Sequence, residues 1–234
     1  MKRLAIFDYH GTLIWALDVH NAAYRDTVKQ LYGVDGSIHD AKNFAASTVQ
    51  LVTKEIAKSR GVPEDVITSH YNEILPTYEK NFISLLEKMK IRVLPGIPEL
   101  LKGLKDSGVA ISIATGDSKR TIDSLLRKAK LNDCFENELR VYASIEPPIT
   151  SRQELVQRAI ELAEGKYRRF GNGEIFLFDD STKGLSAGKE LGLVTVGVGT
   201  GPEGYEKMLE ASPDFAFKDF SNYREVIDIV LGYR

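Results

Sequence analysis

Cysteine, long apolar runs and an excess of either charge are nearly absent from this 234-residue chain. Its single cysteine, Cys134, has no second cysteine with which to form an intramolecular disulfide or a metal-ligand pair, which favours a reducing compartment. No apolar run approaches the roughly 20 residues that span a bilayer, and the early run LAIF stops at Asp8, too short for a signal peptide. We therefore expect a cytoplasmic protein with no membrane partner.

The charge balance argues against a nucleic-acid partner as well. The chain has 31 basic and 33 acidic residues with no basic stripe. Its hydrophobic content of 43%, with ten Phe and ten Tyr, is that of an ordinary globular protein. Because the chain exceeds the usual single-domain length of roughly 100 to 200 residues, we expect a large core plus a smaller unit, in a monomer or a homodimer.

Short runs rich in Ile, Val, Phe and Leu alternate with helical patterns along the chain. This alternation predicts an α/β fold, with a Rossmann-like parallel sheet covered by helices on both faces. A further run could add an edge strand, and an amphipathic helix is expected to close the chain. The predicted strands are 3–7, 109–114, 139–143, 174–178, 193–198 and the edge strand 214–218, and the closing helix is 221–234.

About a hundred residues separate the first two predicted strands, which is too long for a simple crossover. They carry several helical periodicities and no convincing strand, so we predict an inserted all-helical cap with helices at 18–32, 40–60 and 64–88. The predicted domains are a core of residues 1–15 and 89–234 and a helical cap of residues 16–88.

Polar residues follow three of the predicted strands. Asp8 ends the first strand, Thr115 and Gly116 end the second, and Asp179 and Asp180 end the fourth. Ligands of parallel α/β sheets bind at the carboxyl ends of the strands, so these residues should converge on one site. Their carboxylates would repel each other unless a cation lay between them, and hard oxygen ligands suit Mg²⁺.

The stretches FDYHGTL, IATGD and FDDSTKGLSAGKELG, in this order, resemble the haloacid dehalogenase superfamily, in particular its phosphoglycolate-phosphatase-like members with a helical cap. The resemblance implies a phosphatase that hydrolyses small phosphorylated metabolites through an aspartyl phosphate on Asp8. It further implies that Asp8 and Asp180 ligate Mg²⁺, that Asp179 supports the metal directly or through water, and that Thr115 and Gly116 hold the phosphoryl oxygens.

Position 10 departs from the family pattern, which has an aspartate there as general acid and base. This chain has His10. With an unperturbed pKa of about 6.5, a histidine can donate a proton to the leaving oxygen and then take one from water. The family also uses the backbone carbonyl of this position as a metal ligand, which any side chain preserves. The alternative is that His10 only fills space and that turnover has been lost.

The basic residue that the family places ahead of the fourth strand, usually a lysine, is also missing. Arg152 stands in the aligned place and could bridge the nucleophile and the phosphate with its planar guanidinium, although Arg and Lys are not equivalent. The alternatives are that Arg152 is a surface helix residue and that Lys119 or Lys183 takes the role.

The cap must supply groups that read the leaving part of the substrate, and we single out Asn43, Ser47, Thr48 and Lys54 as candidates, against the alternative that they are solvated. The histidines of the cap have no metal-ligand spacing, so each is expected to be a surface or hydrogen-bonded helix residue. They are His20, His39 and His70.

The sequence GTGPEG, with Gly199, Gly201 and Gly204, formally matches a dinucleotide fingerprint. It follows a late strand, contains Pro202 and leaves too little chain for a nucleotide domain, so we interpret it as a flexible or phosphate-edge loop.

Two further functions stay open from the sequence. One is a catalytically impaired homologue that binds phosphate compounds or metabolites. The other is a different phosphoryl- or phosphonate-processing reaction on the same scaffold, although no lysine is evidently placed for the Schiff base of a phosphonatase. Dehalogenation ranks low, because dehalogenases dispense with the metal that Asp179 and Asp180 are expected to hold.

Overall fold

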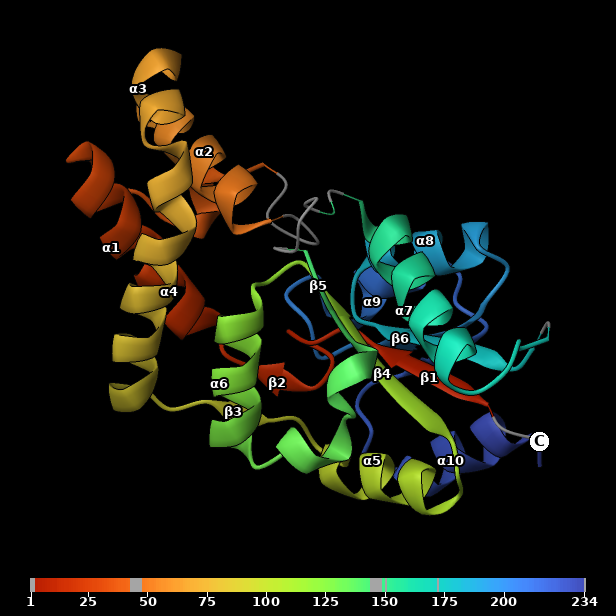
Figure 1. The fold of residues 1–234 in the computed structure, drawn as a ribbon. Coiled ribbons are helices and arrows are strands. Elements are labelled where there is room, and N and C mark those ends of the chain that lie inside the picture. Colours follow the sequence, from red (N-terminus) through yellow and green to blue (C-terminus); the bar gives the residue numbers. More distant parts are fainter. Residues whose placement is uncertain (1–2, 43–47, 144–148, 150, 172, 234) are drawn as a thin grey trace.

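The computed structural model describes residues 3–42, 48–143, 149, 151–171 and 173–233. Six parallel strands form the main sheet in the order β5-β4-β1-β6-β7-β8, and two short strands, β2 and β3, pair antiparallel (Figure 1). The strands are β1 (Leu4–Phe7), β2 (Ile14–Trp15), β3 (Arg92–Val93), β4 (Ala110–Thr115), β5 (Arg140–Tyr142), β6 (Ile175–Asp179), β7 (Val194–Val198) and β8 (Phe215–Phe217).

The helices fall into a group beside the sheet and two groups that cover its faces (Figure 1). They are α1 (Leu17–Tyr32), α2 (Val49–Ser59), α3 (Glu64–Ser69), α4 (Tyr71–Lys88), α5 (Ile97–Asp106), α6 (Lys119–Ala129), α7 (Arg152–Lys166), α8 (Thr182–Glu190), α9 (Gly204–Leu209) and α10 (Tyr223–Leu231). Helices α7 and α8 lie on one face of the sheet and α5 and α10 on the other. The predicted α/β class with an inserted helical cap is confirmed.

The central strand β1 shows why both faces need helices. All four of its residues are fully buried, with Ala5 and Phe7 in one hydrophobic core and Leu4 and Ile6 in the other. Successive residues of a strand point to opposite faces, so a strand that is apolar throughout must be covered on both. The ring of Phe7 stacks on Phe178 of β6 at 4.3 Å between centroids, and burying such a side chain contributes roughly 1.5–3 kcal/mol.

The cap consists of α1 to α4, inserted between β2 and β3 (Figure 1). Strands β2 and β3 lie at the two places where the chain passes between cap and core, a pairing that the sequence did not predict. Helix α4 docks on α6 of the core, where Ser118 Oγ donates a hydrogen bond to Glu79 Oε1 at 2.5 Å. The domain boundaries at residues 16 and 88 stay a prediction.

Two of the predicted cap helices differ from the observed ones. The segment predicted as one helix over 40–60 contains the end of a short 3-10 helix, Ile38–Asp40, then extended backbone at Ala41, and α2 only from Val49. The helix predicted over 64–88 divides at His70 into α3 and α4. Near this division the hydroxyls of Thr68 and Ser69 donate hydrogen bonds to backbone carbonyls. Such bonds compete with the backbone hydrogen bonds of a helix and so favour helix ends.

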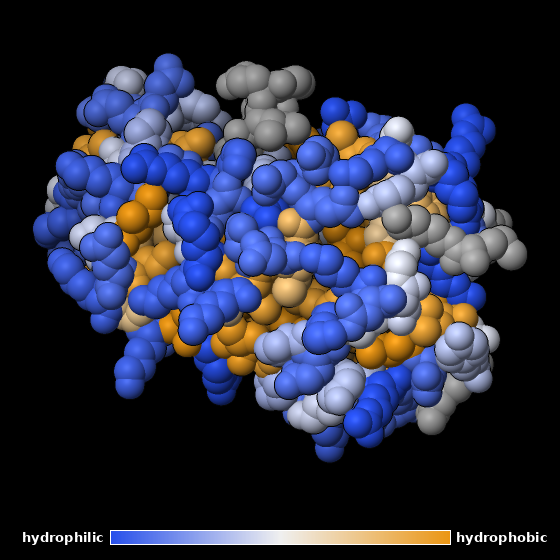
Figure 2. Space-filling view, turned by 60° about the horizontal axis from the view of Figure 1, so that its bottom comes forward, coloured by the Kyte–Doolittle hydropathy of each residue, from blue (hydrophilic) through white to orange (hydrophobic). Residues whose placement is uncertain are grey.

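The six core strands and the closing helix agree with the prediction to within a few residues. Polar and charged side chains cover most of the face seen in Figure 2, with apolar side chains visible between them. Among the described residues, no helix is long and apolar enough to cross a membrane.

Candidate active site

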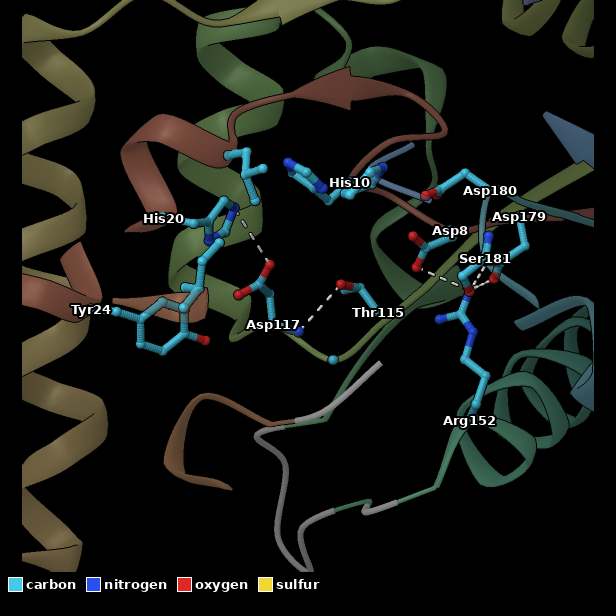
Figure 3. Close-up of a pocket in the computed structure, with 14 residues that line it drawn as sticks. Asp8, His10, His20, Tyr24, Thr115, Asp117, Arg152, Asp179, Asp180 and Ser181 are labelled. Carbon is cyan, nitrogen blue, oxygen red and sulfur yellow. Dashed lines mark hydrogen bonds and ion pairs between the residues drawn. The ribbon is translucent and has the colours of Figure 1, made fainter. Parts of the chain in front are cut away.

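Three strand ends meet at one pocket, as the sequence predicted. Asp8 follows β1, Thr115 ends β4, and Asp179 ends β6 with Asp180 after it; all four line a cavity of about 120 Å³ (Figure 3). β1 lies between β4 and β6 in the sheet, so parallel pairing brings the three ends together at its carboxyl edge.

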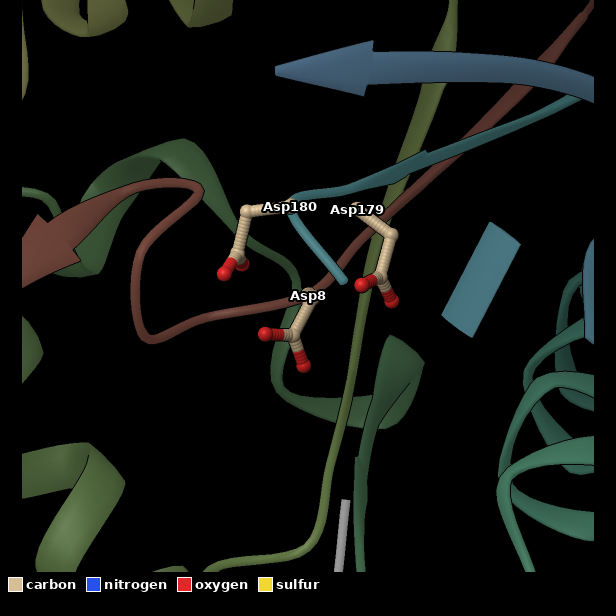
Figure 4. Close-up of side chains that lie close together, drawn as sticks. All are labelled: Asp8, Asp179 and Asp180. Atoms are coloured by element: carbon tan, nitrogen blue, oxygen red, sulfur yellow. The ribbon is translucent and has the colours of Figure 1, made fainter. Parts of the chain in front are cut away.

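The carboxylates of Asp8, Asp179 and Asp180 form a tight cluster (Figure 4). One oxygen of each lies within 4.8 Å of the others. The pKa of Asp8 is raised from 3.8 to about 7, chiefly by burial, with Arg152 lowering it and the nearby Asp179 raising it. Burial, then Asp179 and Asp8, raise the pKa of Asp180 well above its usual range. Three hard oxygen donors that repel each other in this way fit a divalent cation such as Mg²⁺.

Arg152 is the first residue of α7, and its side chain is 1% exposed. Its Nη2 lies 3.0 Å from Asp8 Oδ1 and 2.5 Å from Asp179 Oδ2, and its Nη1 donates to the carbonyl of Ala114 at 2.5 Å. Burial lowers the pKa of Arg152, but the carboxylates around it more than offset this and raise the pKa overall. The alternative that Arg152 is a surface residue is wrong.

The two lysines considered in place of Arg152 lie elsewhere. Lys119 pairs with Asp123 and is 68% exposed, and neither it nor Lys183 lines the pocket. Arg152 is the only Lys or Arg among the described residues that line the pocket. No lysine is therefore placed there, among the residues whose structure is described, for the Schiff base of a phosphonatase.

Asp179 is held by several donors. Besides Arg152 at its Oδ2, the backbone N–H and the hydroxyl of Ser181 donate to its Oδ1 at 2.9 and 2.7 Å. Ser181 also begins α8 as its cap. Both oxygens of Asp179 are thus engaged, while Oδ1 of Asp180 accepts a hydrogen bond from Thr12 Oγ1 at 2.9 Å.

Thr115 is buried, and its hydroxyl oxygen accepts a hydrogen bond from the backbone N–H of Asp117 at 3.2 Å. A hydroxyl that accepts in this way keeps its own proton to donate, and it faces the pocket together with Gly116. Both predicted phosphate-binding residues therefore line the pocket close to the aspartate cluster (Figure 3).

His10 lines the pocket, but its surroundings do not support the pKa expected from the sequence. Its ring lies 5.4 Å from that of Trp15 and 5.5 Å from that of His20, and its Nε2 is buried without a hydrogen-bond partner. Burial, and secondarily His20, lower the pKa of His10 from 6.5 to about 3. A pKa this low does not favour proton transfer by His10 near neutral pH, and its role as general acid and base stays a prediction.

The cap contributes residues to the pocket that the sequence argument did not select. His20 and Tyr24 of α1 line it beside Asp117. His20, expected to be a surface or hydrogen-bonded helix residue, is buried; its Nδ1 lies 2.6 Å from the hydroxyl of Tyr78, and its Nε2 has no hydrogen-bond partner. His20 and Tyr24 are four residues apart, a spacing that places both on one face of α1. The sequence pattern did not show that this face meets the site.

The predicted cap candidates have other positions. Thr48 caps α2 by accepting a hydrogen bond from Leu51 N at 3.3 Å, and Lys54 pairs with Glu64 at 2.6 Å. Neither is among the described residues that line the pocket. Asn43 and Ser47 lie outside the described residues.

The glycine-rich segment after β7 packs on the aspartate cluster. A Cβ on Gly201 would lie 1.7 Å from Asp180 Oδ2, and one on Gly11, whose φ is +84°, would lie 2.5 Å from the same atom. Thr200 Oγ1 donates to the carbonyl of Gly11 at 2.6 Å. The glycines allow two backbone segments to close around Asp180, and Pro202 lines the pocket.

The family described as Haloacid dehalogenase-like hydrolase matches residues 5–198, which include all the strand ends at the site. The chain belongs to this family. Its relatives include Pyrophosphatase PpaX of Bacillus mycoides, to which this chain is 22% identical over 236 residues, with 97% of each chain covered.

Solved structures share the fold. A β-phosphoglucomutase from Clostridium difficile superposes with a TM-score of 0.74 at 18% identity, covering 100% of this chain and 99% of that one. A predicted phosphoglycolate phosphatase from Haemophilus somnus gives 0.71 at 16% identity, covering 96% and 97%. CbbY from Rhodobacter sphaeroides, in complex with phosphate, gives 0.74 at 18% identity, covering 94% and 96%. The family and its phosphatase relatives support a phosphatase function.

Proposed function

We propose that this chain is a Mg²⁺-dependent phosphatase that hydrolyses small phosphate monoesters through an aspartyl phosphate on Asp8. The observation that carries the proposal is the cluster of Asp8, Asp179 and Asp180 beside Thr115 in one pocket. It combines a carboxylate nucleophile, oxygen ligands for a cation and a hydroxyl donor for a phosphoryl oxygen, which are the parts that covalent phosphoryl transfer needs.

Asp8 and Asp180 would hold Mg²⁺, with the backbone carbonyl of His10 as a further ligand. Asp179, with both oxygens already engaged, would support the metal through water. When bound, Mg²⁺ neutralises negative charge on the transferring phosphoryl group.

The chain's own groups would complete the site. Arg152 holds Asp8 Oδ1 at 3.0 Å and so fixes the direction of the attacking carboxylate. Thr115 and the backbone at Gly116 would donate hydrogen bonds to the phosphoryl oxygens. The cap residues over the pocket would limit the access of water to the phosphoryl group until the leaving group has departed.

The charges of the pocket favour a monoester over a diphosphate. Arg152 is the only Lys or Arg among its described lining residues and is already engaged by two aspartates, and Asp117 adds a fourth acidic group. Among the described lining residues, a second phosphate on the substrate would thus find no free cationic side chain, unlike the phosphoryl group beside the metal. The small cavity also suits a small metabolite.

Phosphate release from a panel of small monoesters and pyrophosphate, with and without Mg²⁺, tests the proposal. We expect Mg²⁺-dependent release that is faster for monoesters, and a loss of more than about a thousandfold in Asp8→Asn, since removing a nucleophile costs about that much or more. Activity that survives Asp8→Asn would contradict the proposal.

The enclosed ring of His10 favours one second candidate, a homologue that binds phosphate compounds without hydrolysing them. Its Nε2 is buried without a hydrogen-bond partner, as expected of a side chain that fills space. This candidate predicts Mg²⁺-linked binding of inorganic phosphate without turnover in the wild type, and turnover regained in His10→Asp.

A further inference from the structure

Asp117 is a pocket residue to which the proposed function gives no task. It directly follows Thr115 and Gly116, the residues proposed to hold the phosphoryl oxygens. Its backbone N–H donates a hydrogen bond to Thr115 Oγ1, which fixes its position relative to them. Its side chain is 15% exposed, and its Oδ2 lies 3.8 Å from Nε2 of His20 in the cap. The carboxyl group stands at the junction of core and cap and lines the same pocket as Asp8.

The direction of phosphoryl transfer puts the leaving group on the cap side. The attacking and leaving oxygens lie roughly in line with phosphorus, so the leaving oxygen departs on the side away from Asp8. In Figure 3, Asp117 lies across the pocket from Asp8, beside Thr115 and facing His20. This is the side where a leaving oxygen would need a proton.

We propose that Asp117 is the general acid and base of this site, in the place that the family gives to the residue now occupied by His10. The proposal rests on the proposed function, because it assigns a proton carrier to the transfer that Asp8 performs.

The proton balance closes over the two half-reactions. In the first, Asp8 attacks phosphorus, the bond from phosphorus to the leaving oxygen breaks, and the Asp117 carboxyl gives its proton to that oxygen, which leaves as an alcohol. In the second, the Asp117 carboxylate takes a proton from water, the water oxygen attacks phosphorus, and the bond to Asp8 breaks. Inorganic phosphate leaves, with the Asp8 carboxylate and the Asp117 carboxyl restored.

The electrostatic surroundings of Asp117 are consistent with this cycle. Burial raises its pKa from 3.8 to about 7, near the value at which a group can both give and take a proton. Asp117 faces His20, and its charge raises the pKa of the other titratable groups near it, which are Asp8, Tyr9, Tyr24 and Tyr78. Burial raises the pKa of each tyrosine well above 10 and lowers that of His20 to about 4. Close to neutral pH, Asp117 is therefore the group on the cap side that changes charge.

The test compares leaving groups that need a proton to different extents. An acid matters most when the leaving oxygen is strongly basic, and p-nitrophenolate leaves without help. We expect Asp117→Asn to lower kcat/KM for phenyl phosphate at least about a hundredfold more than kcat/KM for p-nitrophenyl phosphate. This difference lies within the roughly 10²- to 10⁴-fold rate contribution that is usual for a general acid. The ratio of two substrates does not depend on the fraction of folded enzyme. Asp117→Ser repeats the test with another group that does not titrate.

Two further variants accompany the Asp117 variants. Asp133→Asn makes the same chemical change at an exposed position outside the pocket and should leave the ratio at the wild-type value. His10→Gln tests the residue at the family's usual position. The proposal is overturned if Asp117→Asn and Asp117→Ser lose kcat/KM equally for both substrates. It is also overturned if His10→Gln, instead of the Asp117 variants, loses kcat/KM selectively for phenyl phosphate.

The same assay distinguishes a failure of the proposed function from a failure of the role proposed for Asp117. If Asp8→Asn abolishes turnover of p-nitrophenyl phosphate but Asp117→Asn lacks the selective loss, the phosphatase stands and the role of Asp117 falls. If turnover persists in Asp8→Asn, or the wild type has none, the proposed function fails and the role of Asp117 fails with it.

Discussion

Arg152 is buried among acidic groups. Its guanidinium is 1% exposed and contacts Asp8, Asp179 and the carbonyl of Ala114. Breaking a buried pair by removing one partner is costly, because the other charge stays buried without compensation. Arg152 therefore contributes to the folded state as well as to the direction of Asp8.

Arg152→Met tests this at the residue scale. We expect it to lower the free energy of unfolding by about 3–5 kcal/mol at neutral pH without Mg²⁺, measured by urea denaturation. Arg158→Met is the matched control on the same helix, since Arg158 and its partner Glu161 are about half exposed, and it should cost less than about 1 kcal/mol. Similar losses in the two variants would show that the buried cluster does not depend on Arg152.

Part of the site could be predicted from the sequence. Asp8, Thr115, Asp179 and Asp180 were selected because each follows an apolar run, and the parallel sheet brings them together. Arg152 was found only through the family resemblance. The sequence did not single out His20 or Asp117, because their meeting in the pocket depends on how cap and core dock.

At the scale of elements, the site is built by strands that end in carboxylates and by the segments that close around them. Helices α6, α7 and α8 each begin at a serine cap: Ser118, Ser151 and Ser181 accept hydrogen bonds from backbone N–H groups three residues on. The segment after β7 then brings Gly201 against Asp180. The sequence showed a glycine-rich loop here, but its close approach to Asp180, a proposed metal ligand, depends on the fold.

Gly201→Ala should disturb Asp180 through this contact. The added Cβ would lie 1.7 Å from Asp180 Oδ2, so the carboxylate or the loop must move. We expect the Mg²⁺-dependent rise in Tm to fall to less than about half of the wild-type value, since stabilisation by a ligand follows its affinity. Gly165→Ala lies in helix α7 with open space around its Cβ, so it should keep the full Mg²⁺ effect and gain roughly 0.5–1 kcal/mol of stability. If Mg²⁺ raises the Tm of Gly201→Ala as much as that of the wild type, the loop does not contribute to the metal site.

At the scale of the whole molecule, the inserted cap was predictable because a hundred residues without a strand cannot be a simple crossover. The β2–β3 pair at the crossings was not, since two-residue strands carry no periodicity. The breaks within the predicted helices 40–60 and 64–88 depend on local hydroxyl bonds and on packing, which helical spacing alone does not report.

The buried acids and histidines of the pocket give the folded protein opposing dependences on pH. The pKa of Asp117 is raised from 3.8 to about 7, so the folded state holds a proton that the unfolded chain releases, and the stability from this group falls as pH rises from about 4 to 7. His10 and His20 have lowered pKa values of about 3 and about 4, so their contribution falls as pH drops below 6.5.

Comparison of the wild type with Asp117→Asn isolates the acid. Without Mg²⁺, the two proteins should be similarly stable near pH 4, and the variant should become the more stable by up to about 4 kcal/mol near pH 8. Urea denaturation across this range measures the difference. A difference that does not change with pH would mean that Asp117 ionises in the folded protein as readily as in the unfolded chain.

Under the proposed function, Asp8 carries the phosphoryl group during the reaction. The most direct measurement is rapid acid quench of the enzyme mixed with p-nitrophenyl phosphate and Mg²⁺, followed by mass spectrometry of the peptide that contains Asp8. We predict a mass increase of one phosphoryl group on that peptide, located at Asp8, which forms as p-nitrophenol is released and is absent in Asp8→Asn. Turnover at the wild-type rate with no phosphoryl group on Asp8 at any quench time would contradict the account.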